Sequence, residues 1–169
     1  MNNQTLPESL TIYPKILYYG TPVVLLTTLN EDGTTNITPM SSSWALGNYV
    51  MLGLGINGKA VENLKRLGEC VINVPDPGLW NKVEALAPFT GRRDVPEEKK
   101  KKGFRFAKNK FAAADLTGLP SETVKPARVA ECPLQIEAVV RNLRIPEYSP
   151  FFAIIETEAV SFFTRISKS

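Results

Sequence analysis

The chain has 169 residues, of which 43% are hydrophobic and 22% are charged, a composition typical of one compact domain with a buried core and not of a disordered chain. We therefore expect a single domain over residues 1–169. The net charge is only +3 and histidine is absent, which excludes histidine-containing catalytic triads, zinc sites with histidine ligands and proton transfer by imidazole.

The first predicted elements form a β-hairpin. An apolar run over residues 23–29 is followed by a turn signal over 30–33 and by alternation through 35–39. A further strand is predicted over residues 49–56. Its two internal glycines indicate a bulge or a close approach of backbone or ligand.

A short helix is predicted over residues 57–68. Asn57 can cap its start, apolar residues recur at helical spacing, and Gly68 suits its C-terminal end. A strand over residues 69–74 comes next. Asp76, followed directly by proline, then predicts the start of a second helix.

The rest of the chain contains a polar excursion and two long strands. Residues 88–123 are rich in glycine, proline and charge, with one short helix predicted over 96–102, and the long strands cover residues 127–143 and 151–163. Successive strands joined by hairpins, with short helical insertions, predict a mainly β fold. We expect an antiparallel sheet that closes as a β-barrel with the α insertions outside.

Localisation follows from the ends of the chain and from the cysteines. The N-terminus lacks the basic and apolar segments of a secretory leader, and no apolar run approaches the length that spans a bilayer. Cys70 and Cys132 lie far apart in apolar alternating segments, as is typical of buried thiols in a reducing compartment. We expect a cytoplasmic protein with no membrane partner.

A run of small hydroxyl residues, Ser41–Ser43, follows the hairpin near Pro39, where the chain is expected to leave the sheet. Hydroxyls and accessible amides can bind the carbonyls, ring nitrogens or phosphate oxygens of a ligand, and Trp44 can form one wall. The same pattern fits an ordinary polar turn before a core tryptophan, so both interpretations stay open.

Basic residues supply a second set of candidates. The helix start at Asn57, Gly58 and Lys59 combines free amides, a glycine and an ammonium, which together favour phosphate. Arg92 lies in a loop that suits an anion contact. The lysine run at residues 99–102 is typical of a solvated helix face, and because no aromatic platform accompanies it, we expect no nucleic-acid partner.

Four segments, taken in their order along the chain, resemble the flavin reductase-like family of FMN-binding split β-barrels. They are PVVLLTTLNEDGTTNITPMSSSW, LGINGKAVENL, ECVINVP and RVAECPLQIEAVV. The resemblance covers roughly residues 21–140. It implies an antiparallel split β-barrel and a homodimer with FMN at the subunit interface. It also implies hydride transfer between NADH or NADPH and the flavin, which is the reactive group. A monooxygenase that consumes reduced flavin is a partner compatible with this chemistry.

The resemblance also implies which residues contact the flavin. Carried over residue by residue, the segment that contacts the flavin ring falls on Pro39, Met40, Ser41, Ser42, Ser43 and Trp44. The phosphate-binding helix start falls on Asn57, Gly58 and Lys59, and the family's asparagine one turn later falls on Asn63. Arg92 is added as an anion contact. We expect no catalytic side chain and no metal ligand.

The chain departs from the family in two places. Family members often have a hydroxyl residue after the lysine, where this chain has Ala60, and the missing hydrogen bond is worth about 1.5–3 kcal/mol if it was charge-assisted. Many reductases also carry Gly-Asp-His where this chain reads RIPEYSPFFAII. The missing histidine keeps one alternative open, an FMN-binding electron carrier or storage protein without a nicotinamide site. The lysine run keeps open a separate alternative from another class, a barrel that binds single-stranded nucleic acid.

Overall fold

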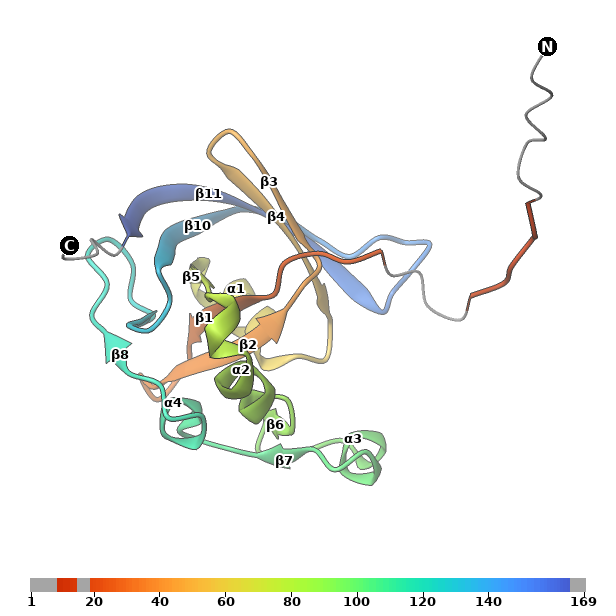
Figure 1. Cartoon of the computed structure of the whole chain (residues 1–169), viewed down its shortest axis with the longest axis horizontal. Coiled ribbons are helices and arrows are strands. Elements are labelled where there is room, and N and C mark those ends of the chain that lie inside the picture. Colours follow the sequence, from red (N-terminus) through yellow and green to blue (C-terminus); the bar gives the residue numbers. More distant parts are fainter. Residues whose placement is uncertain (1–8, 15–18, 165–169) are drawn as a thin grey trace, which may run out of the picture.

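The main element of the computed structural model, which describes residues 9–14 and 19–164, is a seven-stranded antiparallel sheet (Figure 1). Its strands follow the order β2-β1-β5-β10-β11-β4-β3. In chain order they are β1 (Val24–Leu29), β2 (Thr35–Met40), β3 (Ser43–Leu46), β4 (Tyr49–Gly55), β5 (Glu69–Val74), β10 (Leu134–Arg144) and β11 (Phe152–Thr164). The predicted mainly β class is confirmed.

The other elements are short. The helices are α1 (Lys59–Leu67), α2 (Trp80–Leu86), which follows a 3-10 turn at Pro77–Leu79, α3 (Glu97–Lys101) and α4 (Lys110–Ala113). Two small ribbons pair β6 (Phe89–Thr90) with β7 (Arg105–Phe106) and β8 (Gly118–Leu119) with β9 (Arg128–Val129). None of the helices in the described part of the chain is long and apolar enough to cross a bilayer.

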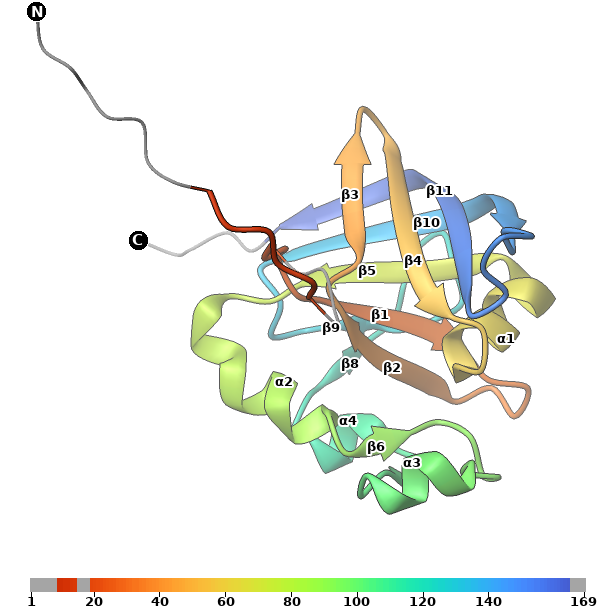
Figure 2. The same ribbon diagram turned by 90° about the vertical axis from the view of Figure 1, so that its right-hand side faces the viewer.

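The connection between β2 and β3 forces the sheet to curl. These strands are the two edges of the sheet, yet only Ser41 and Ser42 lie between them. Six strand spacings of about 4.8 Å would put the edges of a flat sheet about 29 Å apart, whereas three Cα steps span at most about 11 Å. The sheet therefore curls into an open half-barrel (Figure 2), which confirms the predicted split β-barrel.

Two apolar clusters cover the two faces of the sheet. Ala60, Val61 and Leu64 of α1 pack with buried residues of β1, β4, β5, β10 and β11, and Figure 1 shows α1 within the curve of the sheet. The expectation that the helices lie outside is thus wrong for α1. On the other face, α2 and α4 pack against Leu25 and Ile37.

Most predicted elements are present, with a few corrections. The hairpin, the strands over residues 49–56 and 69–74, and the helices that begin near residues 57, 76 and 96 are confirmed. The predicted strand over 127–143 is interrupted by a turn between β9 and β10, and α4 was not predicted. Gly58, not Asn57, caps α1, whereas Gly68 ends it with φ 73° and Asp76 caps the next turn, as predicted.

The serine run does not simply leave the sheet. Ser43 begins β3, which pairs with β4 and was not predicted. The interpretation of Trp44 as a core residue is wrong, because 60% of it is exposed. Both cysteines are buried, as expected.

A buried amide ties three strands together. The side chain of Asn73 is fully buried, its Nδ2 donates to the carbonyl of Leu25 at 2.8 Å, and its Oδ1 accepts from the amide of Val129 at 2.8 Å. A buried polar group that loses its partner costs about 1–3 kcal/mol. Asn73 therefore fixes β9 against the β1–β5 pair.

We expect Asn73→Ala to lower the free energy of unfolding by about 2–4 kcal/mol, because two buried backbone groups lose their partners. Urea unfolding followed by tryptophan fluorescence measures this change. Asn142→Ala, an exposed asparagine on β10, is the matched control and should change stability by no more than about 0.5 kcal/mol. Equal effects of the two substitutions would contradict the role assigned to Asn73.

Candidate functional site

A cavity of about 420 Å³ lies at the corner where β2 and β4 end and α1 begins. We call it the corner cavity. It brings together six of the residues that the sequence predicts as cofactor contacts: Pro39, Met40, Ser41, Ser42, Asn57 and Gly58. Segments about twenty residues apart in the chain thus form one site, in the size range of small-molecule pockets.

The backbone at this corner is held rigidly. The carbonyl of Ser41 accepts from the amide of Ser43 at 2.9 Å, and the carbonyl of Ser42 accepts from the amide of Gly53 at 2.7 Å. A Cβ atom at position 53 would lie 3.2 Å from the Cβ of Ser42. Any larger residue at this position would crowd Ser42, so glycine favours the close approach, which accounts for one of the two glycines noted in the sequence of β4.

The start of α1 is open toward the corner cavity. Gly58 supplies no side-chain cap, and its amide donates to the carbonyl of Gly55 at 3.0 Å. The first amides of a helix have no intrahelical acceptor. Since Gly58, Ala60 and Val61 line the cavity, these amides and the helix dipole favour a ligand with negative charge or acceptor oxygens.

Two residues of the predicted ring-contacting segment lie elsewhere. Ser43 and Trp44 line a second cavity, of about 510 Å³, which we call the side cavity. Ser42 and Gly53 line both cavities. The structure therefore divides the predicted segment between the two sides of the β3–β4 hairpin.

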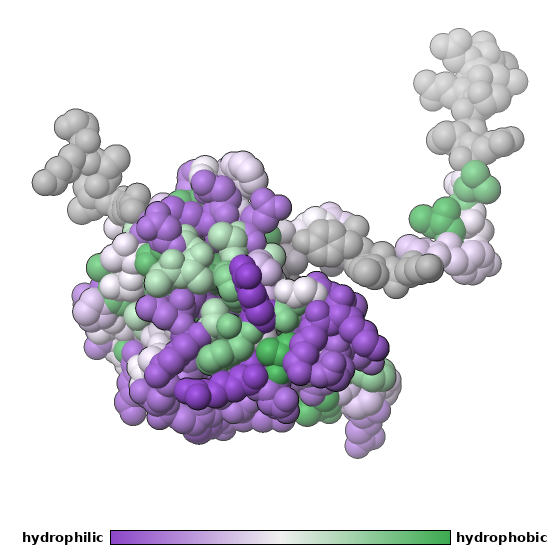
Figure 3. Space-filling model, turned by 90° about the horizontal axis from the view of Figure 1, so that it is seen from below, coloured by the Kyte–Doolittle hydropathy of each residue, from purple (hydrophilic) through white to green (hydrophobic). Residues whose placement is uncertain are grey.

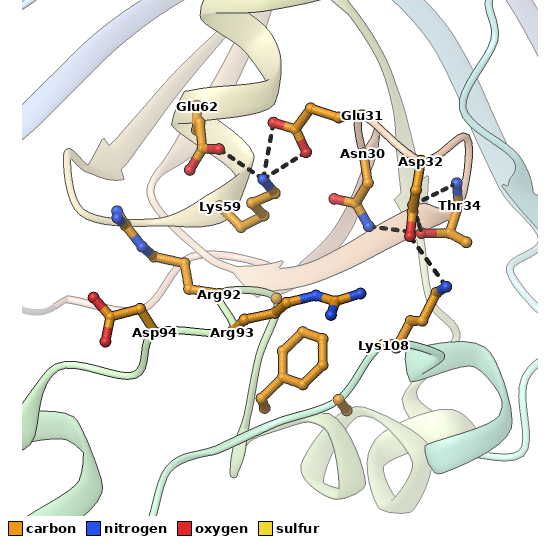
Figure 4. A pocket seen from close by; sticks show the side chains of 13 residues that line it. Asn30, Glu31, Asp32, Thr34, Lys59, Glu62, Arg92, Arg93, Asp94 and Lys108 are labelled. Atoms are coloured by element: carbon orange, nitrogen blue, oxygen red, sulfur yellow. Dashed lines mark hydrogen bonds and ion pairs between the residues drawn. The ribbon is translucent and has the colours of Figure 1, made fainter.

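Lys59 does not line the corner cavity. Its Nζ lies 2.8 Å from Glu31 and 2.7 Å from Glu62, as Figure 4 shows. Burial lowers the pKa of Lys59, but the hydrogen bonds to both carboxylates outweigh burial and raise it. The hydrogen bond from Lys59 also lowers the pKa of Glu31 to about 2. The ammonium that the sequence assigns to phosphate is thus already paired with two carboxylates.

The residues in Figure 4 surround a pocket of about 330 Å³ in which both signs of charge occur. Arg92 lies there, and its guanidinium donates to the carbonyl of Asn57 at 3.3 Å. Its neighbour Arg93 stacks over the ring of Phe106 at 5.6 Å. Arg92 therefore supports the segment that leads into α1.

Asn63 is 1% exposed and lines none of these three cavities. Its Nδ2 donates to Thr28 Oγ1 at 3.1 Å and to Asn30 Oδ1 at 2.9 Å. These bonds join α1 to the end of β1. Asn63 therefore lies on the buried side of α1, facing β1, and does not join the six predicted contacts in the corner cavity.

Sequence reasoning missed three residues near the site. Lys99, interpreted as part of a solvated helix face, lines the corner cavity, and so does Phe151 from the loop before β11. Lys110 lies in a smaller adjoining cavity, together with Lys99. Both lysines come from the polar excursion, whose face is largely hydrophilic with hydrophobic patches (Figure 3). Nothing in the local pattern marks Lys110 as buried.

Lys110 is a buried cation. Only 4% of it is exposed, and its Nζ donates to the carbonyl of Ile37 at 2.8 Å. Burial, with a smaller contribution from the charge of Lys99, lowers the pKa of Lys110 to about 8. No ion pair of Lys110 occurs within the described ranges, 9–14 and 19–164.

Comparison with known proteins gives both sequence and structural likenesses. Residues 16–166 match the family described as flavin reductase like domain. The uncharacterized protein YdfE of Bacillus subtilis is 58% identical over 151 residues, which are 89% of this chain and 73% of YdfE.

Three solved structures share the fold at low identity. Flavoredoxin of Desulfovibrio vulgaris superposes with a TM-score of 0.75 at 18% identity, covering 95% of this chain and 78% of its own. Nitrilotriacetate monooxygenase component B from Bacillus cereus has a TM-score of 0.72 at 18% identity, with coverages of 94% and 83%. An NADH:FAD oxidoreductase of Streptomyces globisporus has a TM-score of 0.70 at 14% identity, with coverages of 94% and 89%.

The lowered pKa of Lys110 predicts a pH-dependent stability. The unfolded lysine keeps its proton up to about pH 10.5 and the folded one only up to about pH 8. Between these values the unfolded state binds more protons, so this residue's contribution to stability rises with pH. From pH 7 to 10, wild type should gain about 2–3 kcal/mol relative to Lys110→Met.

Urea unfolding at the two pH values measures that gain. Lys101→Met, which removes an exposed lysine of α3, is the control and should show the same difference from wild type at both pH values. A stability difference between wild type and Lys110→Met that does not change with pH would contradict the burial of a titrating ammonium.

Proposed function

Because the chain belongs to the flavin reductase-like family, over residues 16–166, we propose that it is an oxidoreductase that holds FMN in the corner cavity and passes hydride between NADH or NADPH and that flavin. The observation that carries the proposal is the corner cavity itself, where Ser41 and Ser42 meet the uncapped start of α1. When bound, the flavin supplies the hydride chemistry.

The residues present fit such a group. Small hydroxyl residues and a fixed backbone suit the carbonyls and nitrogens of a flat ring. Free amides at the start of α1 and the half-buried Lys99 suit a phosphate. Ala60, which replaces the usual hydroxyl residue, is 2% exposed at this wall, so cations from the polar excursion take over part of the phosphate binding.

The protein's role is to bind, orient and shield. Ser41, Ser42 and Asn57 position the flavin ring and its ribityl chain. Phe151 lines the cavity from the loop before β11, where its carbonyl accepts from the amide of Ile56 at 3.1 Å. A chain without histidine can perform this chemistry, because the flavin accepts and donates the hydride. No side chain needs to act as a nucleophile.

A second candidate is an electron carrier that binds flavin but has no nicotinamide site. The observation that favours it is the loop between β10 and β11, where Tyr148 and Phe151 are 82% and 78% exposed and histidine is absent. The likeness in fold to a flavoredoxin agrees with this alternative.

The assembly is also a proposal. We propose a homodimer, because Trp44, Leu46 and Tyr49 on the β3–β4 hairpin are 60%, 74% and 48% exposed, and a second copy would cover apolar surface of this kind. A monooxygenase that consumes reduced flavin is a further proposed partner, supported by the fold likeness to a monooxygenase component B.

An anaerobic reduction experiment tests the proposed activity. The purified full chain, mixed with FMN, should lose its visible flavin absorbance after addition of NADH or NADPH, faster than FMN with the nucleotide alone. A protein that binds FMN, is reduced by dithionite and is reduced by neither nucleotide would overturn the reductase and favour the carrier. A protein that binds no flavin would overturn both.

Light scattering coupled to size-exclusion chromatography tests the homodimer. Wild type should elute with twice the mass of one chain, and Leu46→Glu should shift the equilibrium toward the monomer by at least tenfold in dissociation constant, because a buried unpaired carboxylate is costly. A wild-type monomer at micromolar concentration would rule the proposal out.

A further inference from the structure

A smaller cavity of about 340 Å³, here called the lysine pocket, adjoins the corner cavity. The two share Thr38, Pro39, Gly58 and Lys99 in their walls. A ligand in the corner cavity can therefore extend into the lysine pocket past the start of α1. The pocket lies between the end of β2 and the polar excursion.

The charges in the lysine pocket are of one sign. Lys59, Lys99 and Lys110 line it, and no aspartate or glutamate among the described residues does. The charge of Lys59 is matched by Glu31 and Glu62. Lys99 and Lys110 are left as two cations whose charges no carboxylate in the described part of the chain balances.

The position of Lys110 is fixed although its charge is unbalanced. The bond to the carbonyl of Ile37 uses one of its three N–H groups. The neighbouring charge of Lys99 makes protonation of Lys110 harder. An anion between the two ammonium groups would replace this repulsion with two attractions, and burial would strengthen both.

The pocket shown in Figure 4 offers a contrast. Its cationic residues Lys59, Arg92, Arg93 and Lys108 face Glu31, Asp32, Glu62 and Asp94 across the same space. An anion entering there meets as many carboxylates as cations. The lysine pocket, which no carboxylate of residues 9–14 and 19–164 lines, is the better anion site of the two.

We propose that Lys99 and Lys110 bind the phosphate of the flavin in the lysine pocket and so determine the preference for FMN over riboflavin. This inference rests on the proposed function, because it assigns a subsite within the same ligand site. The main phosphate contacts are then Lys99 and Lys110 of the polar excursion, in place of Lys59 at the helix start. The uncapped amides of α1, beside the shared Gly58, complete the subsite.

Binding of FMN and riboflavin to the flavin-free full chain, followed by quenching of flavin fluorescence, tests the proposal. Lys110→Met and Lys99→Met should each weaken FMN about 10- to 100-fold, the range expected for a lost charge-assisted bond, while riboflavin affinity stays within about twofold. Lys110→Arg, which keeps the charge, should recover part of the FMN affinity. Lys101→Met, on the exposed side of α3, is the matched control and should leave the ratio of the two affinities unchanged.

Riboflavin binding also serves as the test of folding, because a variant that binds riboflavin normally has an intact ring site. Equal losses for both flavins in Lys110→Met, or an unchanged FMN affinity, would overturn the phosphate assignment and leave the proposed function standing. A change confined to the Michaelis constant for NADPH would instead assign the pocket to the nucleotide, and would also overturn it. A wild type that binds neither flavin would overturn the proposed function itself.

Discussion

The two-residue link between β2 and β3 is the constraint on which the site depends. Ser41 and Ser42 hold together the two edges of a seven-stranded sheet, and chain connectivity allows this only if the sheet curls. The curl brings the ends of β2 and β4 to one corner and encloses α1. The corner cavity is therefore a consequence of topology, and its walls are backbone segments that cannot move apart without opening the sheet.

The cations at this corner differ in whether a carboxylate of the described residues pairs with them. Lys59 and Arg92 tie α1 and its leading segment to the β1–β2 turn and to the loop after β6. Lys99 and Lys110 come from the excursion and have no carboxylate partner within residues 9–14 and 19–164. Burying Lys110 costs stability at neutral pH, and such a cost is typical of groups that bind a ligand.

Local patterns in the sequence predicted much of the fold. The hairpin, α1 and the capped turn at Asp76 depend on neighbouring residues, so turn and cap signals found them. The pairing of β3, the exposure of Trp44 and the place of Lys110 depend on contacts distant in the chain. Lys110, for example, bonds to a carbonyl 73 positions away. Six of the predicted site residues meet in one cavity. They were predicted from the order of segments shared with a family, which relates distant parts of the chain, whereas hydrophobic periodicity describes only neighbouring residues.

The thin wall between the corner and side cavities limits how this protein can diversify. Ser42 and Gly53 each line both spaces, so a substitution at either position alters two surfaces at once. A change that reshapes the corner cavity at either position therefore also reshapes the side cavity. The polar excursion and the loop before β11 line the corner cavity but not the side cavity, so a substitution there alters the corner cavity without altering the side cavity.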